Sequence, residues 1–162
     1  MKLELKSIKH TAWASEETHC YQANLYVDGK PVAVVSNDGH GGCDRDYDHP
    51  KFKGDSRDYR AVMKSIEEYF ESLPPSPFSY EGADGVMIHD SMRQTLEFWC
   101  CDQVNDWLSA RELKKKLKAG FLFQFADKVG VFAHKTRPSR AHKATILNDL
   151  PFDEALAIWK AT

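Results

Sequence analysis

The sequence predicts an α+β fold: an antiparallel sheet of two hairpins with three or four helices. Two pairs of alternating apolar segments are each joined by a short turn, so the paired strands run in opposite directions. Other segments repeat apolar residues every three or four positions, which is typical of amphipathic helices. The order of these segments favours hairpins over the strand–helix–strand units that a parallel sheet requires.

The length and composition favour one ordinary globular domain. A chain of 162 residues and 18.5 kDa fits a single domain, which we expect over 1–162. Charged residues make up 28% of the chain, which excludes disorder, collagen and coiled coil as descriptions of the whole. The sequence has no apolar run long enough for a membrane span and no signal peptide, so we expect a cytoplasmic protein.

An N-terminal hairpin region is expected over 1–37. Apolar residues alternate with Lys and Glu over 3–8, as in a half-buried first strand. Two further alternating runs, 20–27 and 32–35, flank Asp28-Gly29. Asp-Gly between two such runs is the strongest short-range signal for a hairpin.

A polar loop and a helix follow the hairpin. Residues 36–57 are polar and glycine-rich, and at 22 residues they exceed the usual length of a connection. Apolar residues at 3–4 spacing predict a helix over 57–73, which Pro74-Pro75 ends. We expect a second loop over 74–89.

The rest of the chain predicts a second helix, a second hairpin and a third helix. A capping box at 91–94 marks the start of a helix expected over 91–118, with a kink or a new start near Ser109. Alternating phenylalanines predict a hairpin over 120–135. The last apolar stripe predicts a C-terminal helix over 151–161.

The glycine-rich segment at 37–42 is the candidate ligand site. Glycines let the backbone bend tightly and approach a ligand, and successive amides would cradle an anion. Asp38 and His40 would then supply acid–base catalysis. The structural alternative is a tight turn that leaves a strand. The candidate ligand-binding residues are Asn37, Asp38, Gly39, His40, Gly41 and Gly42.

Two incomplete metal patterns lie in the polar loop. His40, Cys43 and His49 offer nitrogen and sulfur ligands to zinc, and residues 44–48 place Asp at every second position, as a calcium loop does. The zinc pattern lacks paired close ligands, and the calcium pattern lacks the glycine of its turn. We therefore expect no metal and no other cofactor.

Charge is distributed unevenly along the chain. Residues 1–110 carry 11 basic and 19 acidic side chains, whereas residues 111–162 carry 11 and 5. A cationic end suits an acidic patch on a partner protein, and it also permits nucleic acid to bind through 111–143; a solvated face is the plain alternative. The candidate partner-binding residues are Arg111, Lys115, Lys118, Arg137 and Arg140.

Three phenylalanines lie beside these cations in the expected hairpin. Phe121, Phe123 and Phe125 would suit stacking on nucleic-acid bases if their rings were exposed. Their alternation favours the core instead, because one face of a hairpin normally packs on the rest of the domain.

The N-terminal residues carry a resemblance. The runs M-K-L-E-L-K-x-I-K at 1–9, E-E-T-x-C-Y-x-A-x-L-Y-V-D-G-K at 16–30 and S-N-D-G-H-G-G at 36–42 resemble a group of small uncharacterised bacterial proteins of plasmid, prophage and phage contexts. No activity is established for that group, so no site residue carries over. The resemblance implies an accessory protein of a mobile element, one that counters host defence.

Two classes of function remain open from the sequence. The chain contains neither a G-x-S-x-G nor an H-E-x-x-H motif, so it has no complete catalytic set and we lean towards a protein without catalysis. The leading hypothesis is an accessory protein that binds a host protein or complex, such as a component of CRISPR or nucleotide-signalling defence. The alternative is a small nucleotide- or phosphate-binding protein or enzyme that uses the loop at 37–42.

Overall fold

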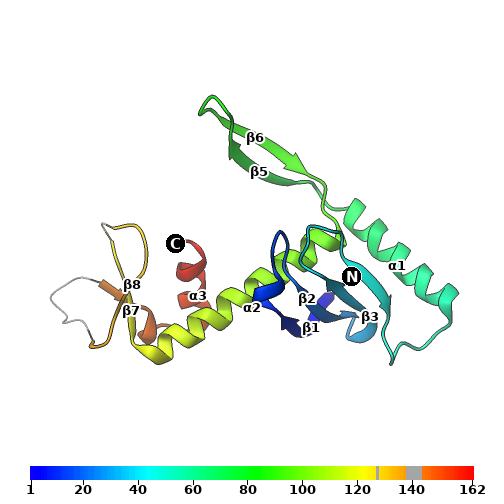
Figure 1. The fold of residues 1–162 in the computed structure, drawn as a ribbon, viewed down its shortest axis with the longest axis horizontal. Helices are drawn as coiled ribbons and strands as arrows, with labels where there is room; N and C mark the ends of the chain where they lie inside the picture. The colour runs from blue at the N-terminus through cyan, green and yellow to red at the C-terminus, as the bar shows by residue number, and fades with distance from the viewer. Residues whose placement is uncertain (127, 138–143) are drawn as a thin grey trace. The chain divides into compact units, whose positions relative to one another are not determined.

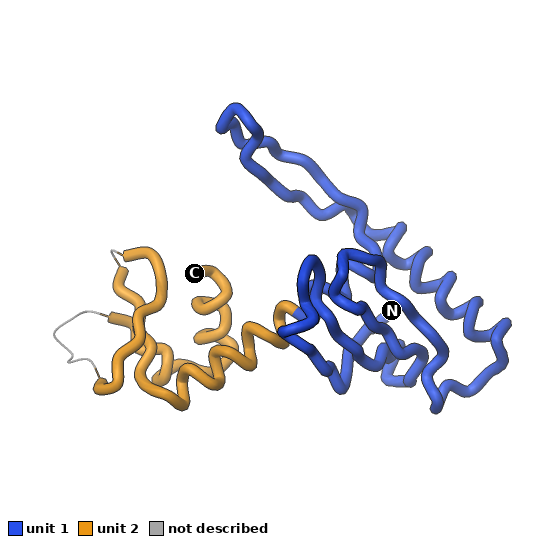
Figure 2. The backbone as a smooth tube through the Cα atoms, viewed as in Figure 1, with its two compact units in different colours: residues 1–104 blue, residues 105–162 orange. Residues whose placement is uncertain are grey.

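The computed structural model describes residues 1–126, 128–137 and 144–162. The described residues form three α-helices and nine strands in antiparallel sheets, which confirms the predicted α+β class (Figure 1). The sequence predicts one domain over 1–162, and the structure divides the chain into two compact units, unit 1 (1–104) and unit 2 (105–162) (Figure 2). None of the helices in the described parts is long and apolar enough to cross a membrane.

Unit 1 contains a four-stranded sheet of order β1-β2-β3-β4. The predicted hairpin is confirmed between β2 and β3, where Asp28 and Gly29 turn the chain with φ values of 48° and 78°. Positive φ at both positions is the signature of a type I′ turn. The prediction of a polar loop over 36–57 is wrong in part, because residues 45–48 form strand β4 and pair with β3. The strands are β1 (Leu3–His10), β2 (Tyr21–Val27), β3 (Lys30–Asn37) and β4 (Arg45–Asp48), with a 3-10 turn at Ala12–Ala14.

One face of this sheet forms the core of unit 1 with two helices. Tyr21, Ala23 and Leu25 alternate along β2 and are buried, as period-two alternation requires. Helix α1 (Ser56–Glu71) matches the prediction, and Asp55 caps it by accepting hydrogen bonds from the amides of Arg57 and Asp58. The helices contribute Ile66 and Phe70 from α1 and Cys100 and Val104 from α2 (Leu96–Ala119).

Residues 74–95 differ from the prediction. The expected loop forms a hairpin of β5 (Ser76–Glu81) and β6 (Met87–Met92). The helix expected from residue 91 therefore begins at Leu96, because Ser91 is paired within β6. Thr95 caps it instead, its hydroxyl accepting a hydrogen bond from the amide of Phe98.

Helix α2 also runs without a break past Ser109, where a kink was expected. The apolar stripe changes face because the two ends of the helix serve different cores. Val104 is buried in unit 1 and Leu113 in unit 2. Nine residues at 100° each separate them, so these two side chains leave the helix on opposite sides.

Unit 2 packs a small sheet on the end of α2 and on α3. The predicted second hairpin and C-terminal helix are confirmed, and a strand after the hairpin, β9, was not expected. The core is formed by Leu113, Leu122, Leu147 and Ala155. The elements are β7 (Phe121–Phe125), β8 (Phe132–His134), β9 (Ala144–Ile146), a 3-10 turn at Leu147–Asp149 and α3 (Phe152–Lys160).

Candidate functional site

One buried side chain, that of Asn37, makes four hydrogen bonds around the glycine-rich loop, and the backbone amides of residues 16–18 add three more to the carbonyl of Gly39. Asn37, only 7% exposed, accepts hydrogen bonds at Oδ1 from the hydroxyl of Thr18 (2.7 Å) and from the amide of Gly39 (2.9 Å). Its Nδ2 donates to the carbonyl of Gly42 (2.8 Å) and to Asp44 Oδ1 (3.0 Å). All four bonds are internal to unit 1, so the side chain fixes the loop from both ends.

The amides proposed to cradle an anion are largely engaged. The amide of Gly39 donates to Asn37 and that of Gly41 to the hydroxyl of Thr18 (3.3 Å). The amide of His40 faces Asp38 Oδ1 at 3.4 Å. A phosphate would have to displace these bonds, so the geometry favours the structural turn, and anion binding stays a prediction without geometric support.

The two candidate catalytic residues engage different partners. The carboxylate of Asp38 pairs with Arg45 at 2.9 Å, and His40 Nδ1 lies 3.1 Å from Glu16 Oε2. Both pairs are well exposed to solvent. The described contacts therefore do not join Asp38 and His40 into one acid–base pair.

The candidate zinc ligands also contact different groups. His49 is buried, its Nδ1 accepts a hydrogen bond from the amide of Lys51 (3.0 Å), and its ring lies 6.2 Å from that of Tyr26. Cys43 is exposed. Within the described ranges, no three His, Cys, Asp or Glu side chains are placed to hold a metal ion.

The basic helical candidates share one stretch of α2. Arg111, Lys115 and Lys118 follow each other at spacings of four and three, which places them on one helix face. All three are exposed, and the guanidinium of Arg111 lies 5.2 Å from the ring centre of Trp107. They form a cationic surface without an enclosed site.

The remaining two basic candidates belong to the segment after β8. Arg137 pairs with Asp149 at 2.5 Å and lies 5.8 Å from the ring centre of Phe121. Arg140 lies outside the described residues.

Six exposed large apolar residues lie on the β5–β6 hairpin and its turn, where no site was predicted. Every residue of both strands is exposed, and Figure 1 draws the pair as a two-stranded arm of unit 1. In the observed register, Phe78 opposes Asp90, Tyr80 opposes Ile88 and Ser76 opposes Met92. Opposed residues lie on the same side of a sheet, so the apolar residues gather on one side. We call this set the hairpin face: Phe78, Tyr80, Val86, Ile88 and Met92.

The opposite side of the hairpin carries polar residues together with the exposed side chain of Met87. Ser79 opposes His89, and the two side chains are hydrogen bonded at 2.6 Å. On the hairpin face, in contrast, the rings of Phe78 and Tyr80 stack with centroids 5.9 Å apart. Tyr80 is 47% and Val86 58% exposed. The hairpin is thus amphipathic, although no described element covers its apolar side closely.

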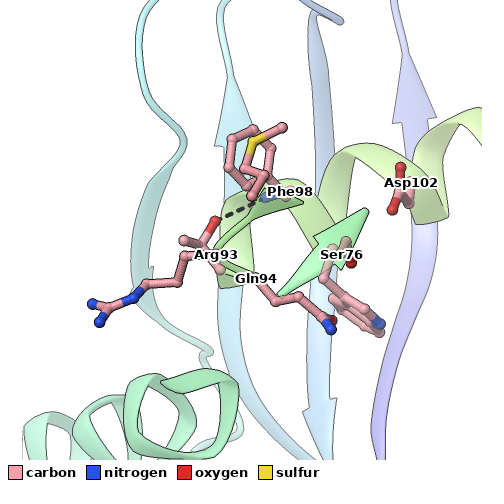
Figure 3. Close-up of a pocket in the computed structure, with 8 residues that line it drawn as sticks. Ser76, Arg93, Gln94, Phe98 and Asp102 are labelled. Atoms are coloured by element: carbon pink, nitrogen blue, oxygen red, sulfur yellow. Dashed lines mark hydrogen bonds between the residues drawn. The ribbon is translucent and has the colours of Figure 1, made fainter. Parts of the chain in front are cut away.

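A pocket of about 170 Å³ lies at the base of the hairpin (Figure 3). Met92, the last residue of the hairpin face, lines it together with Phe98 and Trp99 of α2. Gln94 is fixed there, since its Nε2 donates to the carbonyl of Pro74 at 2.8 Å. The other lining residues are Ser76, Arg93, Thr95 and Asp102. The pocket continues the hairpin face and adds polar groups to it.

A second hollow of about 280 Å³ lies between β3, β4, α1 and the start of α2. Its lining combines apolar side chains, among them Val35 and Met63, with carboxylates. Two of these carboxylates already accept hydrogen bonds from tyrosines: Asp44 from Tyr21, and Asp46 from Tyr59 at 2.5 Å. Burial raises the pKa of both tyrosines, so their hydroxyls remain donors to these carboxylates.

The sequence contained signals for the hairpin that the prediction did not use. Phe78 and Tyr80 alternate with polar residues, and Asp84-Gly85 provides a turn before the second run. The structure closes that turn with a hydrogen bond from the amide of Gly82 to the carbonyl of Val86 (2.8 Å).

Comparisons of this chain with protein-family models, with curated proteins and with solved structures find no match. The N-terminal resemblance to mobile-element proteins therefore stays a prediction. A function for this chain has to be inferred from its own residues and surfaces.

Proposed function

We propose that this protein works by binding another protein through the hairpin face and the pocket at its base. The observation that carries the proposal is the exposure of five large apolar side chains on one side of the β5–β6 hairpin. Contiguous exposed apolar surface is typical of interaction sites.

The energetics of a hairpin support this proposal. A two-stranded hairpin is only marginally stable by itself in water, and this one gains little from the rest of unit 1 because its residues are all exposed. Burying a fully exposed aromatic or large aliphatic side chain contributes about 1.5–3 kcal/mol. Side chains that are 37–47% exposed gain a part of that amount when a partner covers them. A partner surface over Phe78, Tyr80 and Ile88 would supply the burial that the isolated chain lacks.

The charges of the hairpin define the kind of partner. Residues 76–92 contain Glu81, Asp84 and Asp90 and neither Lys nor Arg. A complementary surface is therefore an apolar groove with a basic rim, since unlike charges around an apolar centre favour encounter and fix orientation. The pocket beside Met92 and Phe98 would receive one side chain of the partner.

The identity of the partner follows from a separate expectation. The N-terminal resemblance to mobile-element proteins implies a host protein, including components of defence systems. That expectation is part of the proposal, and it does not depend on the geometry of the hairpin.

The test is affinity capture from a host lysate with the full chain as bait and quantitative mass spectrometry as readout. The decisive variant is Phe78→Ser/Tyr80→Ser, which makes the hairpin face polar. The matched control is Ser79→Ala/His89→Ala, which changes the opposite side of the same strands. We expect a stoichiometric protein with the wild type and with the control, and its loss with the face variant.

Two results would contradict the proposal. One is the recovery of no stoichiometric partner at gentle salt; the other is equal capture by the face variant and the control. Light scattering on the purified chain adds a check on self-association. A dimer that the face variant dissolves would show that the hairpin face binds a second copy instead of a different protein.

A further inference from the structure

The sheet of unit 2 has one face in the core and one aromatic face. Along β7, Leu122 is 2% exposed and belongs to the unit 2 core. Its neighbours Phe121 and Phe123 leave the strand on the other side, as does Phe125. The alternation favoured these three phenylalanines for the core; their side chains are half-buried, and Leu122 takes the fully buried side of the strand.

Phe132 of β8 completes a cluster of rings on this side. It opposes Phe123 in the sheet, and their rings stack with centroids 6.1 Å apart. Phe125 lies edge-on to both, 5.3 Å from Phe123 and 5.7 Å from Phe132. Phe132 is 38% exposed. We call Phe121, Phe123, Phe125 and Phe132 the aromatic face.

Cations lie directly over these rings. Lys128 Nζ is 5.2 Å from the ring centre of Phe125 and 5.9 Å from that of Phe132. The guanidinium of Arg137 is 5.8 Å from the ring centre of Phe121. The aromatic face therefore combines π surfaces with positive charge over them. Both cations are on exposed side chains, and Arg137 is also paired with Asp149.

The charge of the surrounding chain agrees with this local pattern. Residues 111–162 carry 11 basic and 5 acidic side chains, which is a balance of +6. A surface of this sign selects an anionic ligand. A ligand that also uses these rings, of which Phe132 is exposed and the other three are half-buried, must carry planar groups spaced between its charges.

We propose that the aromatic face of unit 2 binds single-stranded nucleic acid. Bases stack on Phe132 and on the half-buried rings beside it, while Lys128 and Arg137 contact the adjacent phosphates, with a phosphate replacing Asp149 as the partner of Arg137. Stacking on aromatic side chains within a cationic groove is how proteins hold single strands without reading their sequence. A duplex is a poorer ligand, because its base faces are already stacked on each other.

Lys128 has a double role in this arrangement. In the free protein its ammonium covers the rings of Phe125 and Phe132, where a cation is attracted to the π electrons. Its flexible stem lets the ammonium move to a phosphate when a base takes its place on the ring. This surface is distinct from the hairpin face, so either proposal can fail without the other.

The test is fluorescence anisotropy with the full chain and labelled oligo(dT) or oligo(U) of about 16 nucleotides. A duplex of the same length serves as the competing probe. Phe132→Leu keeps an apolar side chain but removes the ring, whereas Phe132→Tyr keeps the ring. Phe78→Leu, on the β5–β6 hairpin, is the control for a general effect of losing an exposed phenylalanine.

We expect single strands to bind more tightly than the duplex. Phe132→Leu should weaken binding roughly 5- to 100-fold, and Phe132→Tyr and Phe78→Leu should leave it nearly unchanged. Lys128→Ala should reduce the slope of log affinity against log salt by about 0.7, the value for one phosphate contact on a single strand.

A second measurement does not depend on any variant. Oligo(U) with 5-iodouridine, cross-linked by light to the wild type and digested with trypsin, should label the peptides 119–128 and 129–135. Cross-links confined to other peptides would overturn the proposal.

Three binding results would also overturn it. No anisotropy change at low salt removes nucleic acid as a ligand. Equal affinity for single strand and duplex, with no effect of Phe132→Leu, leaves only general electrostatic attraction. Complete displacement of the oligomer by an equal charge of poly-glutamate would indicate an acidic protein as the ligand of these cations.

Discussion

The hydroxyl of Thr18 donates a 2.7 Å hydrogen bond to the side-chain carbonyl of Asn37, although 19 residues separate the two. The same hydroxyl accepts from the amide of Gly41, so Thr18 contacts both the strand end and the loop. Together with the backbone bonds from residues 16–18 to the carbonyl of Gly39, this pair ties the glycine-rich segment to the fold of unit 1.

Replacing Asn37 by Ala should lower the free energy of unfolding by about 2–4 kcal/mol, because it leaves the hydroxyl of Thr18, the amide of Gly39 and the carbonyl of Gly42 without their partner. Thr18→Val keeps the volume and removes the hydroxyl, so we expect a smaller loss of about 1 kcal/mol. Urea unfolding followed by far-UV circular dichroism measures both. Equal, negligible effects would show that the loop is not held by this network.

Alanine substitutions at three glycines should distinguish the cost of a steric clash from the cost of a strained backbone. Gly39 has a φ of +91°, and an added Cβ would lie 1.9 Å from the carbonyl oxygen of Ala14, so Gly39→Ala should cost about 3 kcal/mol or more. Gly29 has a φ of +78° with open space around it, so Gly29→Ala should cost about 1–2 kcal/mol. Gly42→Ala meets neither obstacle and should stay within about 0.5 kcal/mol. Denaturant midpoints that reverse this order would contradict the observed loop geometry.

Stability should fall at alkaline pH through Cys100. Burial, with the charge of Asp44 nearby, raises the pKa of this thiol from 9.0 to about 12. Between these values the unfolded chain loses the proton and the folded chain keeps it. The contribution of the Cys100 thiol to the free energy of unfolding is therefore fully present below pH 9. It declines above pH 9 by at most about 1.4 kcal/mol per pH unit.

Urea unfolding at pH 8 and pH 10 measures this effect. Cys100→Ala removes the titrating group and should make the decline with pH shallower, while Cys43→Ala, at an exposed thiol, should not change it. Identical pH dependence in the wild type and Cys100→Ala would exclude the thiol as its source.

The β5–β6 hairpin should be removable without unfolding unit 1. Ser76 and Met92 are cross-strand partners, so the chain ends left by excising residues 77–91 lie side by side and can be joined by Asn-Gly. Because the excised residues of the two strands are exposed, we expect the free energy of unfolding to change by no more than about 0.5 kcal/mol. Circular dichroism and urea midpoints check this. A large loss of stability would mean that the hairpin belongs to the core.

The sequence predicted those elements whose signals are local. The turn at Asp28-Gly29 and the helix capped by Asp55 each carry their information within a few residues, and both are confirmed. Strand β4 could not be found in this way, because three of its four residues are charged, all four are exposed, and only pairing with β3 makes it a strand.

The hairpin at 76–92 was missed for a related reason. Ser91 and Gln94 satisfy the pattern of a capping box, but the pattern alone does not decide between a helix start and a strand end. The pairing of Ser91 with Pro77 decides it in favour of the strand. The hydrogen bonds around Asn37 were equally out of reach, since the sequence does not show that Thr18 is its neighbour.

Helix α2 contributes residues to both cores, so we expect its middle to depend on both of them. Its first nine residues end at Val104, which is buried in the core of unit 1. The other fifteen include Leu113, which is buried in the core of unit 2. Neither piece is long enough to stay well helical alone in water. Loss of one core should therefore fray the helix back to the residue buried in the other, and amide hydrogen exchange should accelerate across 105–112 whenever either unit opens. A substitution or a partner that loosens one unit would therefore shorten the helix on which the other unit also packs.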